Sequence, residues 1–279
     1  PGIPSGVLTL LAEHGTMTFA QVAQPAIEYA EGFPIGEEFA GFLKNGANIL
    51  AMMPASRDFF LPGGKMPERG EIYRLADLAN TFKKMAAVEK KARGNRVKKI
   101  NAVHDYFYKG EIAKTIADFM AKNDGLMTVE DLAKYRAKFD EPRRTTFHGY
   151  EVLKPGFFTQ GPVMIEALNI LEGYDLKAMG HNSPQYLHTV LEAVKLAFAD
   201  RDRYYGDPDF SKIPEQELLS KEYGTRRRKQ IDDARANNEH RPGTVAGMTA
   251  VALPAEAAQE HDVAQDTTCV NVVDKWGNV

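Results

Sequence analysis

The sequence predicts a mixed α and β chain that is mostly helical with a few strands. Apolar residues recur at helical spacing over long stretches such as 18–31 and 183–203. By contrast, residues 145–153 alternate in the manner of a strand, with His148-Gly149 as a turn or bulge within it. A second strand-like run occupies residues 267–279. These patterns indicate an α+β protein in which helices dominate.

The composition is typical of a soluble globular protein. Of the 279 residues, 43% are hydrophobic and 26% charged, and the net charge of -3 predicts neither a nucleic-acid surface nor an acidic tail. No apolar run approaches the roughly 20 residues of a membrane-spanning helix. Cys269 is the only cysteine, which excludes an internal disulfide. Because the chain opens at Pro1-Gly2, without a methionine, we expect an internal fragment of a longer protein.

The first half is predicted as short helices joined by turns. Gly32 is expected to end one helix, and Gly94-Asn95 to break another within residues 75–103. Helices with one apolar face are expected, in order, at residues 7–11, 18–31, 37–50 and 112–120.

The second half carries clearer helix starts. Thr128 is a predicted N-cap, with Asp131 in the capping-box position. Ser183 is another, followed by Pro184 at the first helical position. A helix is expected at 163–171. The helix after Pro184 is expected to bury a broad stripe formed by Leu187, Val190, Leu191, Val194, Leu196, Ala197 and Phe198.

Other polar residues are predicted to have structural roles. His181 and Asn182 are expected to cap a helix, and Asp207 and Asp209 to fix a turn. The seven histidines are scattered without the spacing of metal ligands, so neither a metal nor another cofactor is expected. Eight Lys and Arg residues between positions 83 and 99 are interpreted as a solvated helix face. A nucleic-acid-binding patch is the alternative, but interleaved aromatic residues are missing.

The chain is predicted to contain three parts. Residues 1–228 form a helical portion, and residues 229–266 a mobile, protease-accessible linker that is polar at first and then rich in Ala, Pro and Gly. Residues 267–279 form the first strand of a further portion. The junction between the last two parts, Asp266-Thr267, is therefore the centre of the functional hypothesis.

Thr267 has a special chemistry only if the peptide bond before it is cut. A threonine hydroxyl is a poor nucleophile until a base removes its proton. A free α-amine titrates near 7.7–8.0 and can be that base on the same residue. Self-cleavage would begin with attack of the Thr267 hydroxyl on the Asp266 carbonyl, giving an ester that water hydrolyses. Taken alone, however, Thr267 and Thr268 also fit two β-branched residues that enter a strand.

A family resemblance favours the first interpretation. The run from Asp266 to Val279 resembles the Thr-Thr-His-x-Ser-Val-Val-Asp-x-x-Gly-Asn start of the small subunit of γ-glutamyltranspeptidases. Matches upstream, in the same order as in that family, are Pro1-Gly2 with Ser5-Gly6, Phe107–Ala113, Leu168–Gly173, Gly180–Ser183, Ala197–Arg201 and Gly206–Phe210.

The resemblance implies a four-layer αββα fold of the N-terminal-nucleophile class, with a precursor that cuts itself into a large and a small subunit. Thr267 would be the catalytic residue and Asp266-Thr267 the self-cleavage point. The enzyme would transfer or hydrolyse the acyl group of γ-glutamyl amides such as glutathione, with water or an amine as acceptor. Its partners would be that substrate and its own small subunit, with no cofactor and no nucleic acid. The resemblance also suggests a periplasmic or secreted protein, with the cytoplasm left open.

Departures from the family pattern leave the substrate open. Cys269 replaces the usual histidine, and the segment from Lys154 to Pro162 replaces a Pro-Pro-Ser-Ser-Gly-Gly segment. The stretch 88–105 is longer than the corresponding passage in the family and is interpreted as a surface insertion. The substrate-binding residues of the family are expected outside this chain. One alternative is therefore an N-acyl amidase of the same fold, similar to cephalosporin acylases. Another is an unprocessed, non-catalytic homologue that acts as a binding or scaffold protein.

Overall fold

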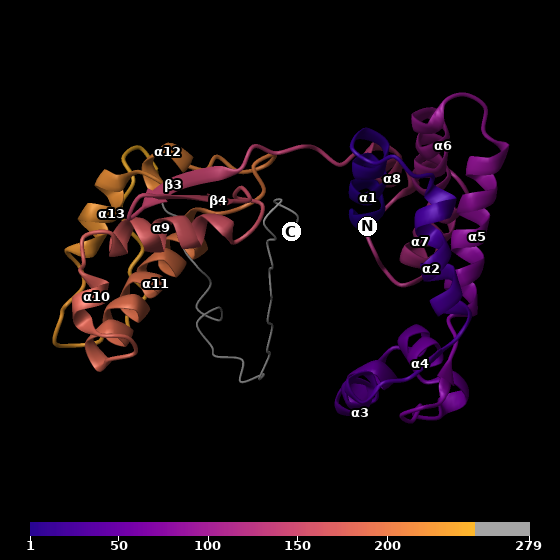
Figure 1. Cartoon of the computed structure of the whole chain (residues 1–279), viewed down its shortest axis with the longest axis horizontal. Coiled ribbons are helices and arrows are strands. Elements are labelled where there is room, and N and C mark those ends of the chain that lie inside the picture. The colour runs from indigo at the N-terminus through magenta and orange to yellow at the C-terminus, as the bar shows by residue number, and fades with distance from the viewer. Residues whose placement is uncertain (249–279) are drawn as a thin grey trace. The chain divides into compact units, whose positions relative to one another are not determined.

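The structure, a computed structural model, describes residues 1–248. It contains two compact units, unit 1 (Pro1–Phe139) and unit 2, which begins at Asp140 (Figure 1). The predicted scissile bond Asp266-Thr267 and the predicted strand 267–279 lie outside the described residues. The division after Phe139 falls inside the span 1–228, because the helices on each side of it make their contacts within their own unit.

Unit 1 is helical apart from a short two-stranded ladder. The ladder pairs β1 (Phe33–Pro34) with β2 (Ile72–Tyr73) in antiparallel fashion. Its helices are α1 (Ile3–Glu13), α2 (Phe19–Glu31), α3 (Glu37–Met52), α4 (Pro54–Phe60), the 3₁₀ turn η1 (Pro62–Gly64), α5 (Ala76–Lys91), α6 (Arg96–Lys109), α7 (Glu111–Lys122) and α8 (Val129–Lys134). These bounds confirm the helices predicted near 7–11, 18–31, 37–50 and 112–120.

The core of unit 1 lies where α1, α2, α5 and α6 meet. Phe19 and Ile27 of α2 pack there with Ile100 and Val103 of α6, and both α6 residues are fully buried. The interpretation of 88–105 as a surface insertion is therefore wrong. Arg96, at the start of α6, donates to the carbonyls of Leu11 and Ala12 at 2.7 and 2.8 Å. The basic residues at the start of α6 are followed, one turn later, by Ile100 and Val103, which face the core.

Ser5 joins three segments of unit 1. Its hydroxyl oxygen lies 2.9 Å from Nε2 of His104 and accepts the backbone N–H of Ala137 at 3.0 Å. Ser5 and His104 are both buried. Burial is the main cause that lowers the pKa of His104, which favours the neutral ring. This serine–histidine pair is closed to substrate and holds α1, α6 and the end of the unit together.

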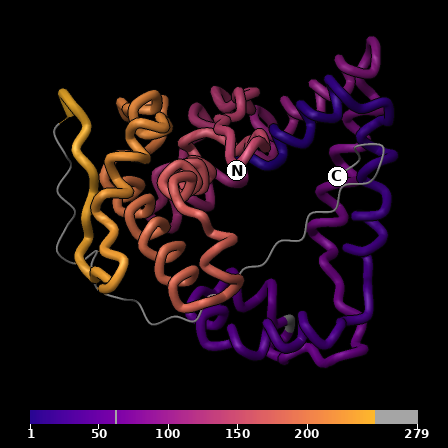
Figure 2. Tube along the Cα trace, turned by 60° about the vertical axis from the view of Figure 1, so that its left-hand side comes forward, coloured from indigo at the N-terminus to yellow at the C-terminus, as the bar shows by residue number. Residues whose placement is uncertain are grey.

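Unit 2 combines a hairpin with a helical layer. Strands β3 (Arg143–Phe147) and β4 (Tyr150–Lys154) pair in antiparallel register around His148-Gly149. The predicted turn at His148-Gly149 is therefore confirmed, and it separates two strands. The helices are α9 (Gly161–Leu171), α10 (Leu176–Met179), α11 (Pro184–Tyr204), α12 (Glu215–Leu218) and α13 (Lys221–Arg228). The path of the chain through them is traced in Figure 2.

The predicted N-caps at Thr128 and Ser183 are confirmed, whereas the expected cap at His181 and Asn182 is wrong, because Ser183 is the residue that caps α11. Thr128 and Asp131 form a reciprocal capping box at α8. Ser183 accepts the N–H of Tyr186 at 3.1 Å and caps α11, with Pro184 at the first helical position. A second capping box, which the sequence analysis did not identify, joins Thr18 to Gln21 at the start of α2.

The broad buried stripe predicted on α11 is narrower than expected. Ala193, Leu196 and Ala197 are buried, mainly against α9 and its neighbours. Leu187 and Leu191, however, are 45% and 59% exposed among the described residues. The apolar pattern of a helix shows which residues are suited to burial. How many of them are buried depends on the elements that pack against the helix.

Candidate functional site

The residues closest in sequence to the predicted self-cleavage point that the structure describes are 241–248. They follow the first part of the predicted linker, and they lie against α11 and α13 at the yellow end of the trace (Figure 2). Thr267 and Asp266 themselves lie outside the described residues. The site can therefore be built from the contacts that hold the chain on its way to them.

A buried ion pair forms the centre of this region. Asp200 of α11 and Arg227 of α13 are 0% and 2% exposed, and Nε of Arg227 lies 2.9 Å from Oδ2 of Asp200. The Arg227 guanidinium also donates to the carbonyl of Leu196 at 3.1 Å and to the side chain of Gln230 at 2.6 Å. A buried charge pair persists when further hydrogen bonds satisfy its remaining atoms, and here several do.

The backbone of the segment Arg241–Val245 binds to this ion pair. Arg227 donates to the Arg241 carbonyl at 2.5 Å, and the Gly243 N–H donates to Oδ1 of Asp200 at 2.6 Å. Tyr204 donates its hydroxyl to the Gly243 carbonyl at 2.6 Å. We call the side chains of Asp200, Tyr204 and Arg227 the anchor site.

Side chains of the same segment add to these contacts. Arg241 pairs with the buried carboxylate of Glu192, with Nη2 2.8 Å from Oε2. Val245 is buried in an apolar cluster that includes Phe157, Leu218 and Tyr223. The described part of the predicted linker is thus fixed to unit 2 at both polar and apolar points.

A second carboxyl group, Glu166 of α9, lies beside the anchor site. It is buried, and Oε1 accepts the hydroxyl proton of Tyr205 at 2.5 Å. Burial first, and then the charge of Asp200, raise the pKa of Glu166 well above its ordinary value. Oε2 of Glu166 has no hydrogen-bond partner among the described residues, which costs less free energy for a neutral acid than for a carboxylate. Both effects favour the neutral form of Glu166 beside the Asp200–Arg227 ion pair.

The segment from Lys154 to Pro162, which departs from the family pattern, forms one wall of an open groove of about 720 Å³. Residues 157–160 line it together with the end of α11 and the turn that follows. Arg201 lies across this wall: it donates to the side chain of Gln160 at 2.8 Å and lies 4.4 Å from the centre of the Phe198 ring. The replacement segment thus presents aromatic and amide side chains at a solvent-accessible groove.

The other polar residues singled out in the sequence have local roles. Asn182 adopts a positive φ of 55° in the turn before α11, and His181 lies near Tyr186 with ring centres 6.2 Å apart. Oδ1 of Asp207 accepts the N–H of Asp209 at 2.9 Å, which fixes the predicted turn. Within residues 1–248 no group of three or more His, Cys, Asp or Glu side chains could hold a metal ion, and no helix is long and apolar enough to cross a membrane.

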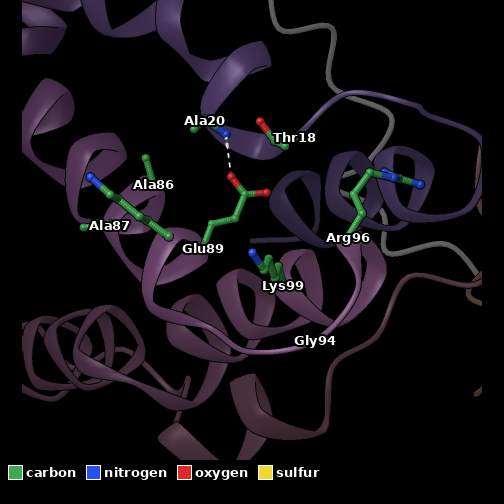
Figure 3. A pocket seen from close by; sticks show the side chains of 9 residues that line it. Thr18, Ala20, Ala86, Ala87, Glu89, Gly94, Arg96 and Lys99 are labelled. Carbon is green, nitrogen blue, oxygen red and sulfur yellow. Dashed lines mark hydrogen bonds between the residues drawn. The ribbon is translucent and has the colours of Figure 1, made fainter.

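The basic stretch of unit 1 borders a separate open pocket of about 510 Å³ (Figure 3). Glu89 points into the start of α2, where it accepts the N–H groups of Phe19 and Ala20, both at 2.8 Å. Lys84 pairs with Glu111 at 2.9 Å, and Lys83 pairs with Glu31. Lys83 and Lys84 are therefore paired with carboxylates of unit 1, which argues against a dedicated nucleic-acid surface.

Sequence reasoning did not identify Glu166 and Arg227 as members of one cluster. Asp200 stood in a recognised motif, Ala197–Arg201, but its partner stood in a polar run of three arginines. A signal was present, because Glu166 and Asp200 are acidic residues that lie among the buried residues of α9 and α11. Charged residues at such positions are rarely buried unless they are paired.

Comparison with known proteins identifies the family of this chain. The sequence model of the family described as Gamma-glutamyltranspeptidase matches residues 1–279. The chain is 36% identical over 283 residues to the glutathione hydrolase proenzyme of Escherichia coli (strain K12), and 35% identical over 281 residues to the Acylase ACY 1 proenzyme of Pseudomonas sp. (strain SE83). Both alignments cover 100% of this chain but only 44% and 45% of the relatives, so the chain spans less than half of their length.

A solved structure gives the same result. The γ-glutamyltranspeptidase of Helicobacter pylori superposes with a TM-score of 0.77 at 27% identity, over 95% of this chain and 70% of that one. The predicted fold class is confirmed: the described residues are a mostly helical part of an α+β fold of the N-terminal-nucleophile type. With a family match along its whole length and this structural likeness, the chain belongs to the gamma-glutamyltranspeptidase family.

Proposed function

We propose that the protein containing this chain is an N-terminal-threonine enzyme that cuts itself between Asp266 and Thr267. It then transfers or hydrolyses the acyl group of γ-glutamyl amides such as glutathione. The family match that continues through residue 279, and so includes Thr267-Thr268, is the observation that carries this proposal. Residues up to Asp266 would form the large subunit, with 229–266 as its terminal linker, and the strand 267–279 would begin the small subunit.

The proposed chemistry has two stages. In the first, the Thr267 hydroxyl attacks the Asp266 carbonyl, and the C–N bond of the peptide breaks, which frees the α-amine of Thr267 and leaves an ester between the two residues. Water then hydrolyses this ester, which gives the Asp266 carboxylate and restores the Thr267 hydroxyl. In the second, the amine removes the hydroxyl proton and the oxygen attacks the γ-carbonyl of the substrate. The leaving amine takes the proton, and a γ-glutamyl-threonine ester remains. Water or an acceptor amine then attacks this ester and regenerates Thr267.

The first test is the intact mass and N-terminal sequence of the full-length protein. Two fragments, the smaller beginning Thr267-Thr268-Cys269, are expected. Thr267→Ala should remain a single chain without turnover, and Thr267→Ser should keep part of both reactions. Thr268→Ala is the matched control, because it removes the neighbouring hydroxyl and should still be cut. Turnover by Thr267→Ala would contradict the mechanism.

An acylase is the second candidate, since a relative named as an acylase is 35% identical over the whole chain. Three amides with the same leaving group separate the two substrate classes: γ-glutamyl, glutaryl, which lacks the α-amine, and 4-aminobutyryl, which lacks the α-carboxylate. A γ-glutamyl enzyme should prefer the first by a large factor, because buried polar groups built for the missing substituents would be left unpaired. Equal or better turnover of the glutaryl amide would favour the acylase.

The third outcome is a protein that is never cut. Without cleavage Thr267 has no α-amine, and the proposed base is missing. A single full-length mass after long incubation of the purified wild-type protein would therefore exclude the enzyme and leave the unprocessed binding homologue.

A further inference from the structure

We infer that unit 2 contains a built receptor for the segment Arg241–Val245, and that this receptor retains the segment after the chain is cut. The first half stands on the geometry alone. The second half rests on the proposed self-cleavage between Asp266 and Thr267, because only then does the segment become part of a free tail.

The anchor site binds backbone groups of the segment. The Arg241 carbonyl and both polar groups of Gly243 are bonded to buried side chains at 2.5–2.6 Å. Tyr204 of α11 and Arg227 of α13 are the donors, and Asp200 of α11 is the acceptor. Hydrogen bonds to charged, buried partners are the stronger ones in proteins.

The receptor also selects glycine by shape. A Cβ atom at Gly243 would lie 2.1 Å from the Tyr223 hydroxyl oxygen and 2.9 Å from Cδ of Arg227. Real Cβ atoms do not approach other atoms so closely, so any larger residue must displace a buried side chain. The close approach of backbone to receptor thus requires glycine at this position.

Flanking side chains close the site on either side. Before Gly243, the Arg241 guanidinium pairs with the buried Glu192 and donates to the Gln230 carbonyl at 2.7 Å. After it, Val245 is buried in the cluster around Tyr223. The segment is therefore held by an ion pair, backbone hydrogen bonds and an apolar contact within five residues, as a bound peptide is.

Retention has a geometric consequence for the proposed enzyme. Residues 246–266, 21 in number, would connect the receptor to the new carboxyl end at Asp266. A chain of that length spans at most roughly 75 Å when fully extended. The released end would therefore stay attached to unit 2 by a tether of limited reach.

Hydrogen exchange of the full-length protein tests both halves. Exchange is measured by mass spectrometry on peptides spanning 238–248, in the wild-type protein after cutting and in Thr267→Ala as the uncut form. We expect the amides of Gly243 and its neighbours to be protected in both forms. Exchange at the rate of an unstructured peptide in both forms would overturn the receptor. Protection in the uncut form alone would overturn retention.

A substitution series tests the shape requirement. Gly243→Ala should accelerate exchange of this segment about 10- to 100-fold, since bonds to the anchor site open as the backbone moves away. Thr244→Ala is the matched control, because Thr244 is exposed and next in sequence. Adding Tyr223→Phe to Gly243→Ala removes the clashing hydroxyl and should restore part of the protection. Unchanged protection in Gly243→Ala would contradict the receptor.

The outcomes separate this inference from the proposed function. A wild-type chain that is never cut would exclude the proposed enzyme, whereas exchange of Gly243 in that same uncut chain would still decide whether the receptor exists. If Gly243→Ala does not fold, the receptor is still tested by comparing the cut and uncut forms, because neither form carries a substitution in the receptor.

Discussion

Nε of Arg227 lies 2.9 Å from Oδ2 of Asp200, and both side chains are buried between helices that begin 37 residues apart in the chain, at Pro184 and Lys221. Arg227 also carries hydrogen bonds to α11 and to the segment after α13. One guanidinium thus joins three segments of unit 2.

Arg227→Met should destabilise the protein strongly. It leaves the buried Asp200 carboxylate without its cation, which typically costs about 3–5 kcal/mol. Arg144→Met is the matched control, because Arg144 and Glu151 are 60% and 55% exposed and such surface pairs contribute at most about 1 kcal/mol. Urea unfolding of both variants measures the difference. Equal losses would mean that the buried pair has no special role.

The raised pKa of Glu166 predicts that the stability of the protein depends on pH. The pKa of Glu166 is raised in the folded protein, so the unfolded chain loses this proton first as pH rises. The free energy of unfolding should therefore fall between the ordinary pKa of glutamate and the raised one. Asp200, whose pKa is raised mainly by burial, acts in the same direction, while Arg227 opposes both shifts. Tyr205 and Tyr223 also face this cluster.

Glu166→Gln should flatten this dependence, because glutamine keeps the shape and the donor of the protonated acid but does not titrate. Urea midpoints measured from pH 5 to pH 9 would show it. Glu151→Gln, on the exposed face of β4, should keep the wild-type slope. A Glu166→Gln profile parallel to the wild-type one would show that another group is responsible.

The hairpin turn offers a stabilising substitution. His148 and Gly149 have φ values of 46° and 87°, which correspond to the turn in which Asn-Gly is preferred. His148→Asn should gain about 0.5 kcal/mol, because asparagine tolerates positive φ better. Loss of the ring contact with Phe147, 4.4 Å between centres, offsets part of it. Gly149→Ala should be destabilising by about 1 kcal/mol in the same thermal unfolding assay. A stabilising Gly149→Ala together with a destabilising His148→Asn would contradict this turn conformation.

Ser5→Ala should destabilise unit 1. It leaves the buried Nε2 of His104 and the half-buried N–H of Ala137 without their partner, a cost of about 1–3 kcal/mol. The exposed Ser211→Ala should change stability by less than about 0.5 kcal/mol. Chemical denaturation with a fluorescence readout compares the two. A neutral Ser5→Ala would show that water replaces the serine hydroxyl.

Local signals in the sequence predicted local structure well. The caps at Thr128 and Ser183 were predictable because each depends on residues within three positions of one another. The break at Gly94-Asn95 was predictable for the same reason, and Asn95 indeed caps α6. The identity of the chain followed from several such motifs in one order.

Signals that depend on distant partners could not be predicted. The anchor site joins residues 27 and 43 positions apart, and a charged residue on a helix gives no sign of which distant cation it meets. Leu187 and Leu191 were expected to be buried but are exposed, because an apolar pattern does not show whether another element packs against it. The assignment of Thr267 stays a prediction, because it lies outside the described residues.

The anchor site has a consequence for the order of events during synthesis. Every side chain that binds Arg241–Val245 comes from residues that leave the ribosome before this segment does, and the proposed nucleophile leaves still later. Domains generally fold from the N-terminal side as the chain is made. The receptor for the segment Arg241–Val245 would thus be ready before Thr267 leaves the ribosome, and the nascent chain would already be bound to unit 2 when the proposed nucleophile emerges.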